Sequence, residues 1–369
     1  MNVRILAVAA IIIIVAALAA VSMRTTGGAA AEPIRIGALL ILSGEGSSWG
    51  LAEQNGITMA VERINAEGGI NGRPLEIVFQ DDRGDPTAAL SGFRNLESQG
   101  INVIIGTTWS RTGLAVAPLA NASRTIMISP SLGVAEFNEQ SEYLFNLWPH
   151  DFLLSEELAQ IVYERGYRNV AVVGAQEVWV RDQTGAFTRR FGRLDGNISL
   201  LFEPNVDNRD MRTEALRLRD SDADAVIFLT DGVQVGTIMA QRIREQGIEL
   251  PSFSVTLTQD DITASRGAYD GTVFLTSLTP SSQFESKYNE RFGQLEIGGD
   301  SAYDAVMLLA QAMRATNSTD TTVLTEYLNS VEMFNGVSGD MTADGRGGFI
   351  KPYATMMIVN GTAVPFEFA

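Results

Sequence analysis

The sequence predicts an α/β protein of two lobes, each built on a parallel sheet that helices cover on both faces. Three observations lead to this prediction. Short apolar runs of strand length alternate with longer segments whose apolar residues recur at helical spacing. The alternation stops near residue 150 and then begins again, so the chain contains two such series. Its 369 residues are also enough for about two domains of ~150 residues each.

The first series shows why each element is expected. Residues 34–42 form a continuous apolar run that ends at Ser43-Gly44, which is typical of a strand buried on both faces. Residues 51–66 carry apolar side chains at helical spacing and end at Glu67-Gly68-Gly69, a signal for a helix C-terminus. The same reasoning predicts strands at 75–79, 101–105 and 125–129 and helices at 87–98 and 111–121.

The second series follows after about residue 150. We expect helices at 153–165, 182–194, 210–220 and 233–246, and strands at 169–173, 198–202 and 225–229. The last segment differs, with helices at 282–293 and 302–315, glycine-rich hairpin turns at 336–350, a strand at 353–359 and a turn at 360–361. Because these late elements must join sheets that already exist, we expect the chain to pass between the lobes more than once.

Composition argues against several classes of function. The chain has 27 Lys+Arg and 44 Asp+Glu, a formal charge of −17, whereas nucleic-acid phosphates need a basic surface. The absence of cysteine excludes disulfides, a thiolate nucleophile and Cys-ligated metal centres. The single histidine, His150, leaves no spare imidazole for the common catalytic triads. No nucleophile–base pair or metal set is visible, so we expect no enzyme, no cofactor and no bound metal.

The first 31 residues are expected to direct export. Arg4 precedes an apolar run at 5–23, and Ala29-Ala30-Ala31 offers an A-x-A-like cleavage site, as in a secretory signal peptide. An uncleaved anchor is the alternative, because the run approaches the ~20 residues that span a bilayer. In either case we expect the rest of the chain in the periplasm or otherwise outside the cytoplasmic membrane. Without cysteine it is not a lipoprotein.

Ligands of open parallel sheets bind beyond the carboxyl ends of the strands. This rule selects three loops, at 43–50, 106–113 and 129–133. Ser110 is expected at or beside a helix N-terminus, where its hydroxyl and free N–H groups could hold a carboxylate; a simple N-cap is the alternative. The first loop has neither a GxGxxG nor a P-loop pattern, so nucleotide binding has weak support.

Three of the four tryptophans fall in loops of this kind. Trp49, Trp109 and Trp179 lie outside the periodic apolar faces, which favours a cleft with aromatic walls over a set of unrelated packing residues.

Two acidic features have alternative interpretations. Asp231 follows the strand at 225–229 and could pair with a ligand cation or cap the next helix. The run Asp81-Asp82-Arg83-Gly84-Asp85 lacks the alternate ligand spacing of a calcium loop, so a hinge or helix-capping role is favoured there.

The segment after the leader resembles the amino-terminal signature of a known family. Its features are LSG followed by an aromatic-Gly pair, then AVERINAEGGINGRPLE and a DD…DP run. The resemblance is to periplasmic type I solute-binding proteins of the leucine/isoleucine/valine-binding type, which serve ABC importers. Further matches at 106–113, 126–130 and 303–305 extend it over essentially the whole chain after the leader.

The resemblance implies two Rossmann-like lobes joined by three crossovers, with a ligand held between them when the hinge closes. It implies an N-terminal lobe of residues 32–149 and 278–330, and a C-terminal lobe of residues 150–277 and 331–369. It also implies site residues by position. Trp49 and Trp179 match aromatic residues of the cleft wall, and Ser110 matches the serine that binds the ligand carboxylate. Ser131 matches a position that contributes backbone contacts, Gly133 a position often occupied by threonine, and Asp231 a contact loop of the second lobe.

Two departures from the family pattern bear on the ligand. Gly133 supplies no hydroxyl, and the loop at 255–259 has no clear acid where amino-acid binders hold the ligand ammonium, although Asp231 or Asp260-Asp261 could substitute. The resemblance implies a monomer that captures an amino acid or a related small carboxylate and delivers it to an ABC permease complex. A ligand-sensing receptor module for an amide or aromatic acid is the alternative.

Overall fold

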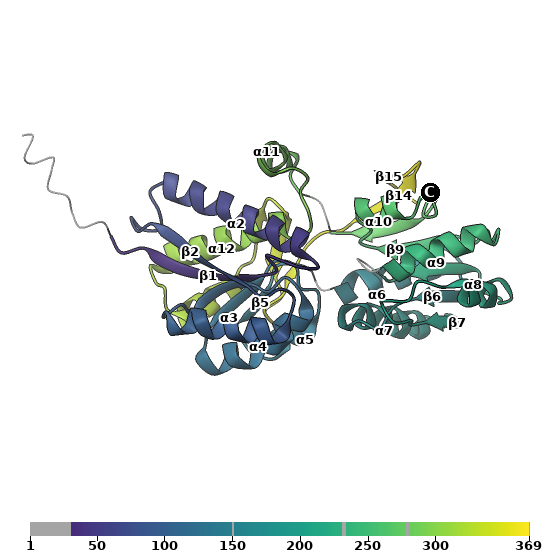
Figure 1. Ribbon diagram of the computed structural model, residues 1–369, viewed down its shortest axis with the longest axis horizontal. Helices are drawn as coiled ribbons and strands as arrows, with labels where there is room; N and C mark the ends of the chain where they lie inside the picture. Colours follow the sequence, from purple (N-terminus) through teal and green to yellow (C-terminus); the bar gives the residue numbers. More distant parts are fainter. Residues whose placement is uncertain (1–30, 150, 231–233, 278–279, 369) are drawn as a thin grey trace, which may run out of the picture.

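Two α/β lobes lie side by side in the computed structural model, which describes residues 31–149, 151–230, 234–277 and 280–368 (Figure 1). The strand order is β2-β1-β3-β4-β5 in the sheet of the first lobe and β15-β14-β10-β9-β8-β6-β7 in the sheet of the second. The strands at the centre of both sheets are parallel, and helices cover both faces. The predicted fold class is therefore confirmed.

The first lobe is built from the early elements and three late helices. Its sheet contains β1 (Ile34–Leu40), β2 (Leu75–Asp81), β3 (Val103–Gly106), β4 (Ile126–Ser129) and β5 (Leu144–Asn146). Its helices are α2 (Ser47–Ala66), α3 (Pro86–Ser98), α4 (Ser110–Ser123), α5 (Ala135–Glu139), α11 (Ser282–Phe292), α12 (Gly299–Thr316) and α13 (Thr321–Asn329). A small antiparallel sheet contains β11 (Phe334–Gly336), β12 (Gly339–Ala343) and β13 (Phe349–Ile350).

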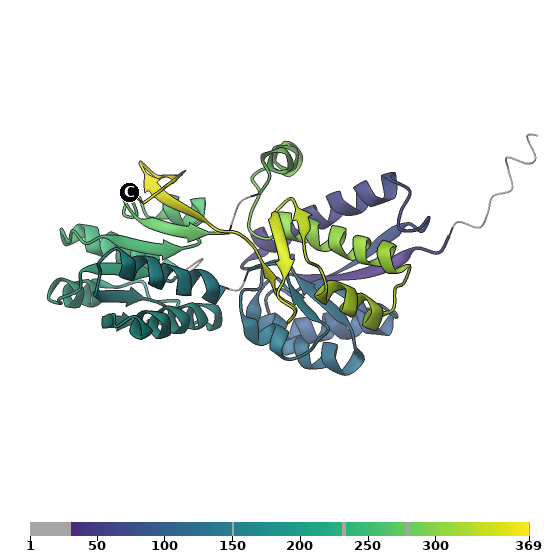
Figure 2. The same cartoon turned by 180° about the vertical axis from the view of Figure 1, so that it is seen from behind.

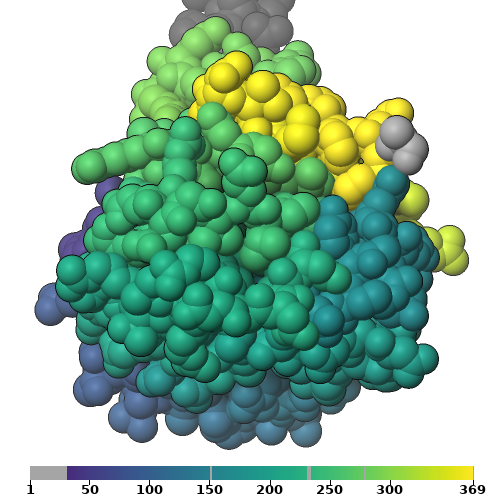
Figure 3. All heavy atoms as spheres, turned by 90° about the vertical axis from the view of Figure 1, so that its right-hand side faces the viewer, coloured from purple at the N-terminus to yellow at the C-terminus, as the bar shows by residue number. Residues whose placement is uncertain are grey.

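The second lobe has a parallel sheet with two antiparallel strands added at one edge. Its parallel strands are β6 (Asn169–Val173), β7 (Asn197–Phe202), β8 (Ala225–Phe228), β9 (Ser252–Val255) and β10 (Val273–Thr276), and its edge strands are β14 (Ala354–Val359) and β15 (Thr362–Pro365). Its helices are α6 (Asp151–Glu164), α7 (Val178–Arg193), α8 (Arg212–Arg219), α9 (Gln234–Glu245) and α10 (Gln259–Ala264). Seen from the end of this lobe, the C-terminal residues (yellow) lie against its green part (Figure 3).

The late segment at 331–350 packs differently from the expected lobe boundary. Phe334, Met341 and Phe349 belong to the same buried cluster as residues of β1, and the amide of Asn146 in β5 donates to the carbonyl of Gly347 at 2.8 Å. The described chain thus leaves the first lobe for the last time after β13 and enters the second lobe at β14. Figure 2 shows this segment (yellow) passing from one lobe to the other. We propose that residues 280–350 form the late part of the first lobe, because the large apolar side chains of the glycine-rich stretch pack into the core of that lobe.

A close backbone contact joins α2 to α12 on one face of the first sheet. A Cβ added at Gly56 of α2 would lie 1.9 Å from the carbonyl oxygen of Gly299, the first residue of α12. Only glycine allows this approach. The contact fixes the start of α12 against α2. It thereby also fixes the position of Ile297, just before α12, relative to Trp49 in the first turn of α2.

No helix in the described part of the chain is both long and apolar enough to cross a bilayer. The predicted leader lies outside the described residues apart from Ala31, and so do His150 and Asp231.

The contact between α2 and α12 can be tested with a pair of glycine variants. Gly56→Ala should lower the free energy of unfolding by about 1–3 kcal/mol, because the new methyl group meets backbone that has no free rotamer to adopt. Gly192→Ala in the last turn of α7 is the matched control, since a Cβ there meets nothing within 4 Å. It should leave stability unchanged or raise it by up to ~1 kcal/mol. Equal urea midpoints for Gly56→Ala and the wild type would contradict the packing.

Candidate ligand-binding site

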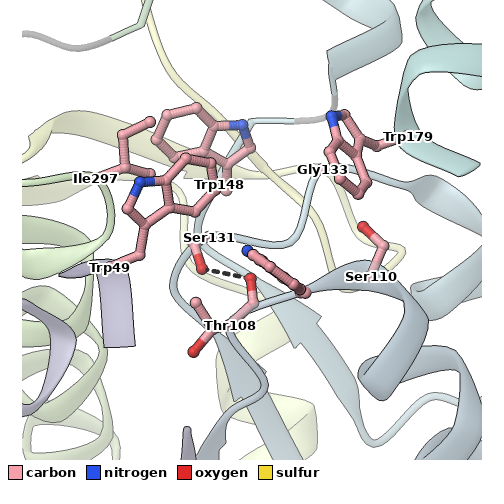
Figure 4. A pocket seen from close by; sticks show the side chains of 9 residues that line it. Trp49, Thr108, Ser110, Ser131, Gly133, Trp148, Trp179 and Ile297 are labelled. Carbon is pink, nitrogen blue, oxygen red and sulfur yellow. Dashed lines mark hydrogen bonds between the residues drawn. The ribbon is translucent and has the colours of Figure 1, made fainter. Parts of the chain in front are cut away.

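A pocket lies where the carboxyl ends of the first-lobe strands face the second lobe (Figure 4). About 380 Å³ of space lies between its protein atoms, and part of that space is open to solvent. Nine residues line it: Trp49, Thr108, Trp109, Ser110, Ser131, Gly133, Trp148, Trp179 and Ile297. Every site residue expected from the sequence lies on this wall except Asp231, which is outside the described residues.

Ser110 is the first residue of α4 and is 4% exposed. The N-cap of this helix is Trp109, and no side chain accepts a hydrogen bond from the first turn, because an indole can only donate. Ser110 is therefore not the N-cap, the alternative that the sequence left open. The first N–H groups of a helix have no partner within the helix and carry its positive end. Together with the Ser110 hydroxyl, they form a place where an oxyanion can bind.

Two glycines leave the space in which the Trp109 indole packs. A Cβ added at Gly46, in the loop after β1, would lie 2.2 Å from the ring, and one added at Gly84, in the loop after β2, would lie 3.2 Å from it. The Arg111 guanidinium lies 4.4 Å from the ring centroid, and its Nε donates to the carbonyl of Gly84 at 2.9 Å. Trp109 thus packs between the loops that follow β1 and β2.

The acidic run at 81–85 organises these loops through hydrogen bonds. Asp85 accepts from the amide of Ala88 at 2.8 Å and caps α3, so the expected capping role is confirmed. Asp81 accepts from the Ser43 hydroxyl at 2.5 Å, which ties the first loop to the end of β2. Burial raises the pKa of Asp82 to about 6. Among the residues that the structure describes, no group of three or more His, Cys, Asp or Glu side chains is arranged to hold a metal ion.

The second lobe contributes Trp179 to the pocket. This residue lies in the first turn of α7, and its half-buried side chain contacts apolar clusters of both lobes. In Figure 4 it faces Ser110 across the pocket. Trp179 therefore brings a side chain of the second lobe to a wall that otherwise belongs to the first.

Three residues of the pocket wall were not expected from the sequence. Thr108 lies in the loop at 106–113, which was expected to contact a ligand, but this residue was not among the expected site residues. Trp148 follows β5, a strand of 3 residues that is too short for its pattern to be recognised. Ile297 precedes α12, far along the chain from the other wall residues, and lies beside Trp49 and Trp148 in Figure 4. No local pattern around Ile297 could have placed it there.

Glu53 lies directly behind the pocket wall and was also missed. It is 0% exposed, and its carboxyl accepts from Thr108 Oγ1 at 2.6 Å and lies within hydrogen-bond reach of Ser131 Oγ. Burial raises the pKa of Glu53 to about 8, although both hydroxyl contacts act against that shift. Its position on the apolar stripe of α2, four residues before Ile57, was the available signal, because a carboxyl on a core-facing stripe needs an explanation.

Two of the second-lobe acids considered as ammonium partners, Asp260 and Asp261, lie away from the pocket. Asp261 accepts from the amide and the hydroxyl of Thr258, at 3.0 and 2.7 Å, in a capping box at the start of α10. Asp260 is exposed, and neither residue lines the pocket. In the described part of the chain, the pocket wall contains no carboxylate side chain.

The sequence of residues 33–363 matches the profile of a family described as periplasmic binding protein. Among curated relatives, the chain is 23% identical over 330 residues to Leu/Ile/Val-binding protein homolog 1 of Brucella melitensis, which covers 87% of this chain and 89% of that one. It is 28% identical over 292 residues to the chemotactic signal transduction system substrate-binding protein BasB of Halobacterium salinarum, covering 76% of this chain and 70% of that one.

Solved structures show the same fold. The substrate-binding protein LivJ of a branched-chain amino acid transporter from Streptococcus pneumoniae, in complex with isoleucine, aligns with a TM-score of 0.78 at 21% identity, over 90% of this chain and 98% of that one. A solute-binding protein of an ABC transporter from Rhodopseudomonas palustris, in complex with 3,4-dihydroxybenzoic acid, aligns with a TM-score of 0.80 at 20% identity, over 91% of this chain and 96% of that one. At these identities the likeness concerns the fold alone.

The resemblance found in the sequence is thus supported by the family profile, by relatives of the leucine/isoleucine/valine-binding type and by the two-lobed fold. The chain belongs to the periplasmic binding protein family, with the type I fold of its branched-chain amino acid binding members.

Proposed function

We propose that this protein is the extracytoplasmic solute-binding protein of an ABC importer, and that it captures an amino acid or a related small carboxylate between its lobes. The observation that supports this most directly is the start of α4, which has no side-chain cap and opens into a pocket lined by four tryptophans. Such a site offers charge and hydrogen-bond donors for one end of a ligand and apolar surface for the other.

The carboxylate end of the ligand binds at Ser110. Its hydroxyl forms no hydrogen bond with any residue that the structure describes, and the adjacent N–H groups carry the positive end of the helix. Thr107 and Thr112 donate to the carbonyl of Trp109, at 3.0 and 2.8 Å, and so fix the turn that presents these donors. The protein therefore supplies a preformed anion site that costs little to organise on binding.

The other end of the ligand is apolar or aromatic. Trp49, Trp109, Trp148 and Trp179 offer flat apolar faces, and Ile297 fills the space beside two of them. Since no described carboxylate faces the pocket, a ligand without an ammonium group fits this wall at least as well as an amino acid. The two structural neighbours named above hold isoleucine and 3,4-dihydroxybenzoic acid, and both are small carboxylates.

Binding shifts the protein towards a closed form. Most of the wall belongs to the first lobe, and Trp179 belongs to the second. A ligand that touches Trp179 only when the cleft closes has a higher affinity for the closed form, and this difference drives the closure. The closed form is then the one that the permease complex recognises.

A second candidate function is a ligand-sensing module of a receptor. The relative BasB of Halobacterium salinarum is named as part of a chemotactic signal transduction system, and it shares 28% identity with this chain. The same pocket and the same closure would serve either role. A retained N-terminal anchor would favour the receptor, whereas cleavage of the leader and export to the periplasm would favour the importer.

The ligand class can be tested by thermal shift with matched carboxylates and amides. Isoleucine, leucine, 4-hydroxybenzoate and 3,4-dihydroxybenzoate form the panel, and 4-hydroxybenzamide and isoleucinamide are the controls. A ligand at 100 times its Kd should add ~2.7 kcal/mol of stability, because it binds only the folded state. We expect a shift with at least one carboxylate and none with its amide. Equal shifts with acid and amide would contradict the anion site.

The role of Ser110 can be tested separately by calorimetry on the same ligand. Ser110→Ala should raise the Kd by about 10- to 100-fold, since a hydrogen bond to a charged group contributes ~1.5–3 kcal/mol. Ser91→Ala, at an exposed position on α3, is the matched control and should leave the Kd unchanged. An unchanged Kd in Ser110→Ala would show that the carboxylate binds elsewhere.

A further inference from the structure

The contacts of Ser131 contain more acceptors than its hydroxyl can satisfy. Ser131 Oγ lies 2.8 Å from the carbonyl oxygen of Thr108, and it also lies within hydrogen-bond reach of Glu53 Oε1 (Figure 4 shows the contact with Thr108). A serine hydroxyl has one proton and can donate to only one of them. If Glu53 were ionised, one of the two buried acceptors would lose its donor.

The contacts of Thr108 show which oxygen of Glu53 accepts a proton from a neighbour. Thr108 Oγ1 accepts from the amide of Ile41 at 3.1 Å, so its own proton is free to go to Glu53 Oε2 at 2.6 Å. A proton on Glu53 Oε1 then supplies the donor that the remaining contact, with Ser131 Oγ, requires. Oε1 donates to Ser131 Oγ, Ser131 donates to the Thr108 carbonyl, and every group in the chain of contacts is satisfied.

The charges around Glu53 also disfavour its ionised form. Asp82, in the loop after β2, raises the Glu53 pKa through its charge. Arg111, on α4, is engaged with Gly84 and Trp109. At the start of α12, Gly298 packs against the Glu53 carboxyl, and the nearby Asp300 is itself buried beside Lys351. The loops that hold Ile41, Thr108 and Ser131 bring only neutral groups to Glu53.

We propose that Glu53 is a positioning residue that keeps its proton in the folded protein and thereby turns the Ser131 hydroxyl towards the Thr108 carbonyl. Ser131 Oγ then offers the pocket a lone pair and no proton. The ligand that fits this surface carries an N–H or O–H donor in addition to its carboxylate, as amino and hydroxy acids do. The ligand class rests on the proposed function, whereas the proton on Glu53 does not.

The proton can be observed without any ligand. In wild-type protein carrying ¹³C at the glutamate side-chain carboxyls, one resonance should titrate near pH 8, and it should be absent from Glu53→Gln. If every glutamate resonance titrated below pH 6, the proposal would be overturned. The wild-type titration keeps the test valid even if the variant folds poorly.

The unfolding equilibrium supplies a second readout. The Glu53 pKa is about 8 in the folded protein against 4.5 for the free side chain, so the stability it contributes is full below pH 4.5 and is lost as the pH rises through 8. Relative to Glu53→Gln, whose amide mimics the protonated acid, the wild-type unfolding constant should rise up to tenfold per pH unit between pH 5 and 8. Asp304, whose pKa burial also raises, titrates in both proteins and drops out of the comparison. A constant ratio over this range would overturn the proposal.

The ligand class is tested with pairs that differ only in the donor. The pairs are isoleucine with 3-methylpentanoate, and 4-hydroxybenzoate with benzoate, all measured by calorimetry at pH 7. In at least one pair the donor-bearing acid should bind about five- to tenfold more tightly, and Ser131→Ala should remove that preference while Glu53→Gln keeps it. Equal affinities within both pairs, or a preference that survives in Ser131→Ala, would overturn the ligand class while leaving the proposed function intact. If none of the four acids bound, the proposed function would fail together with the ligand class, and the carboxyl titration would still decide on the Glu53 proton.

Discussion

The unsatisfied N-terminus of α4 is the constraint around which the proposed site is organised. A helix must find partners for its first N–H groups, and the usual solution is a capping side chain. Trp109 stands at that position and cannot accept a hydrogen bond, so the turn keeps its donors directed at the pocket. The surrounding structure supports this arrangement: Gly46 and Gly84 leave room for the indole, and Arg111 covers it. We infer that the missing partner is the ligand carboxylate.

The two lobes make unequal contributions to the pocket, and in the proposed function this difference couples ligand binding to closure of the hinge. The first lobe supplies the anion site, the hydroxyl of Ser131, and most of the aromatic wall. These parts are held by backbone packing, including the contact between Gly56 and Gly299, so we expect them to change little when the cleft opens. The second lobe supplies Trp179, which also packs against apolar residues of the first lobe. In the proposed function, opening the cleft would remove the contact between the ligand and Trp179 and leave the carboxylate bound at Ser110.

The sequence predicted most of the fold because the two periodicities are strong in long elements. The alternation of apolar strands with amphipathic helices was enough for two parallel sheets, and the strand-end rule brought Ser110 and three tryptophans to one pocket. Short elements such as β5, β9 and α10 were missed, since 3 to 6 residues hold too little of either period. Ile297 and Glu53 were missed for another reason. Their roles come from contacts between distant segments. No local pattern around Ile297 indicates such contacts, and the carboxyl of Glu53 on the apolar stripe of α2 was a signal of burial but not of its partners. The packing of 331–350 on the first lobe was missed for the same reason.

The central claim is that a carboxylate bound at Ser110 closes the second lobe over the pocket, and a distance between two spin labels tests it most directly. The chain has no cysteine, so Glu45→Cys and Asp260→Cys introduce two unique attachment sites. Both positions are exposed and border the cleft: Glu45 lies in the loop before Trp49, and the charge of Asp260 acts on Glu296 of the first lobe. With the carboxylate that gives the largest thermal shift, the distance between the labels should shorten and its distribution should narrow. A distribution that stays unchanged at saturating ligand would contradict the account.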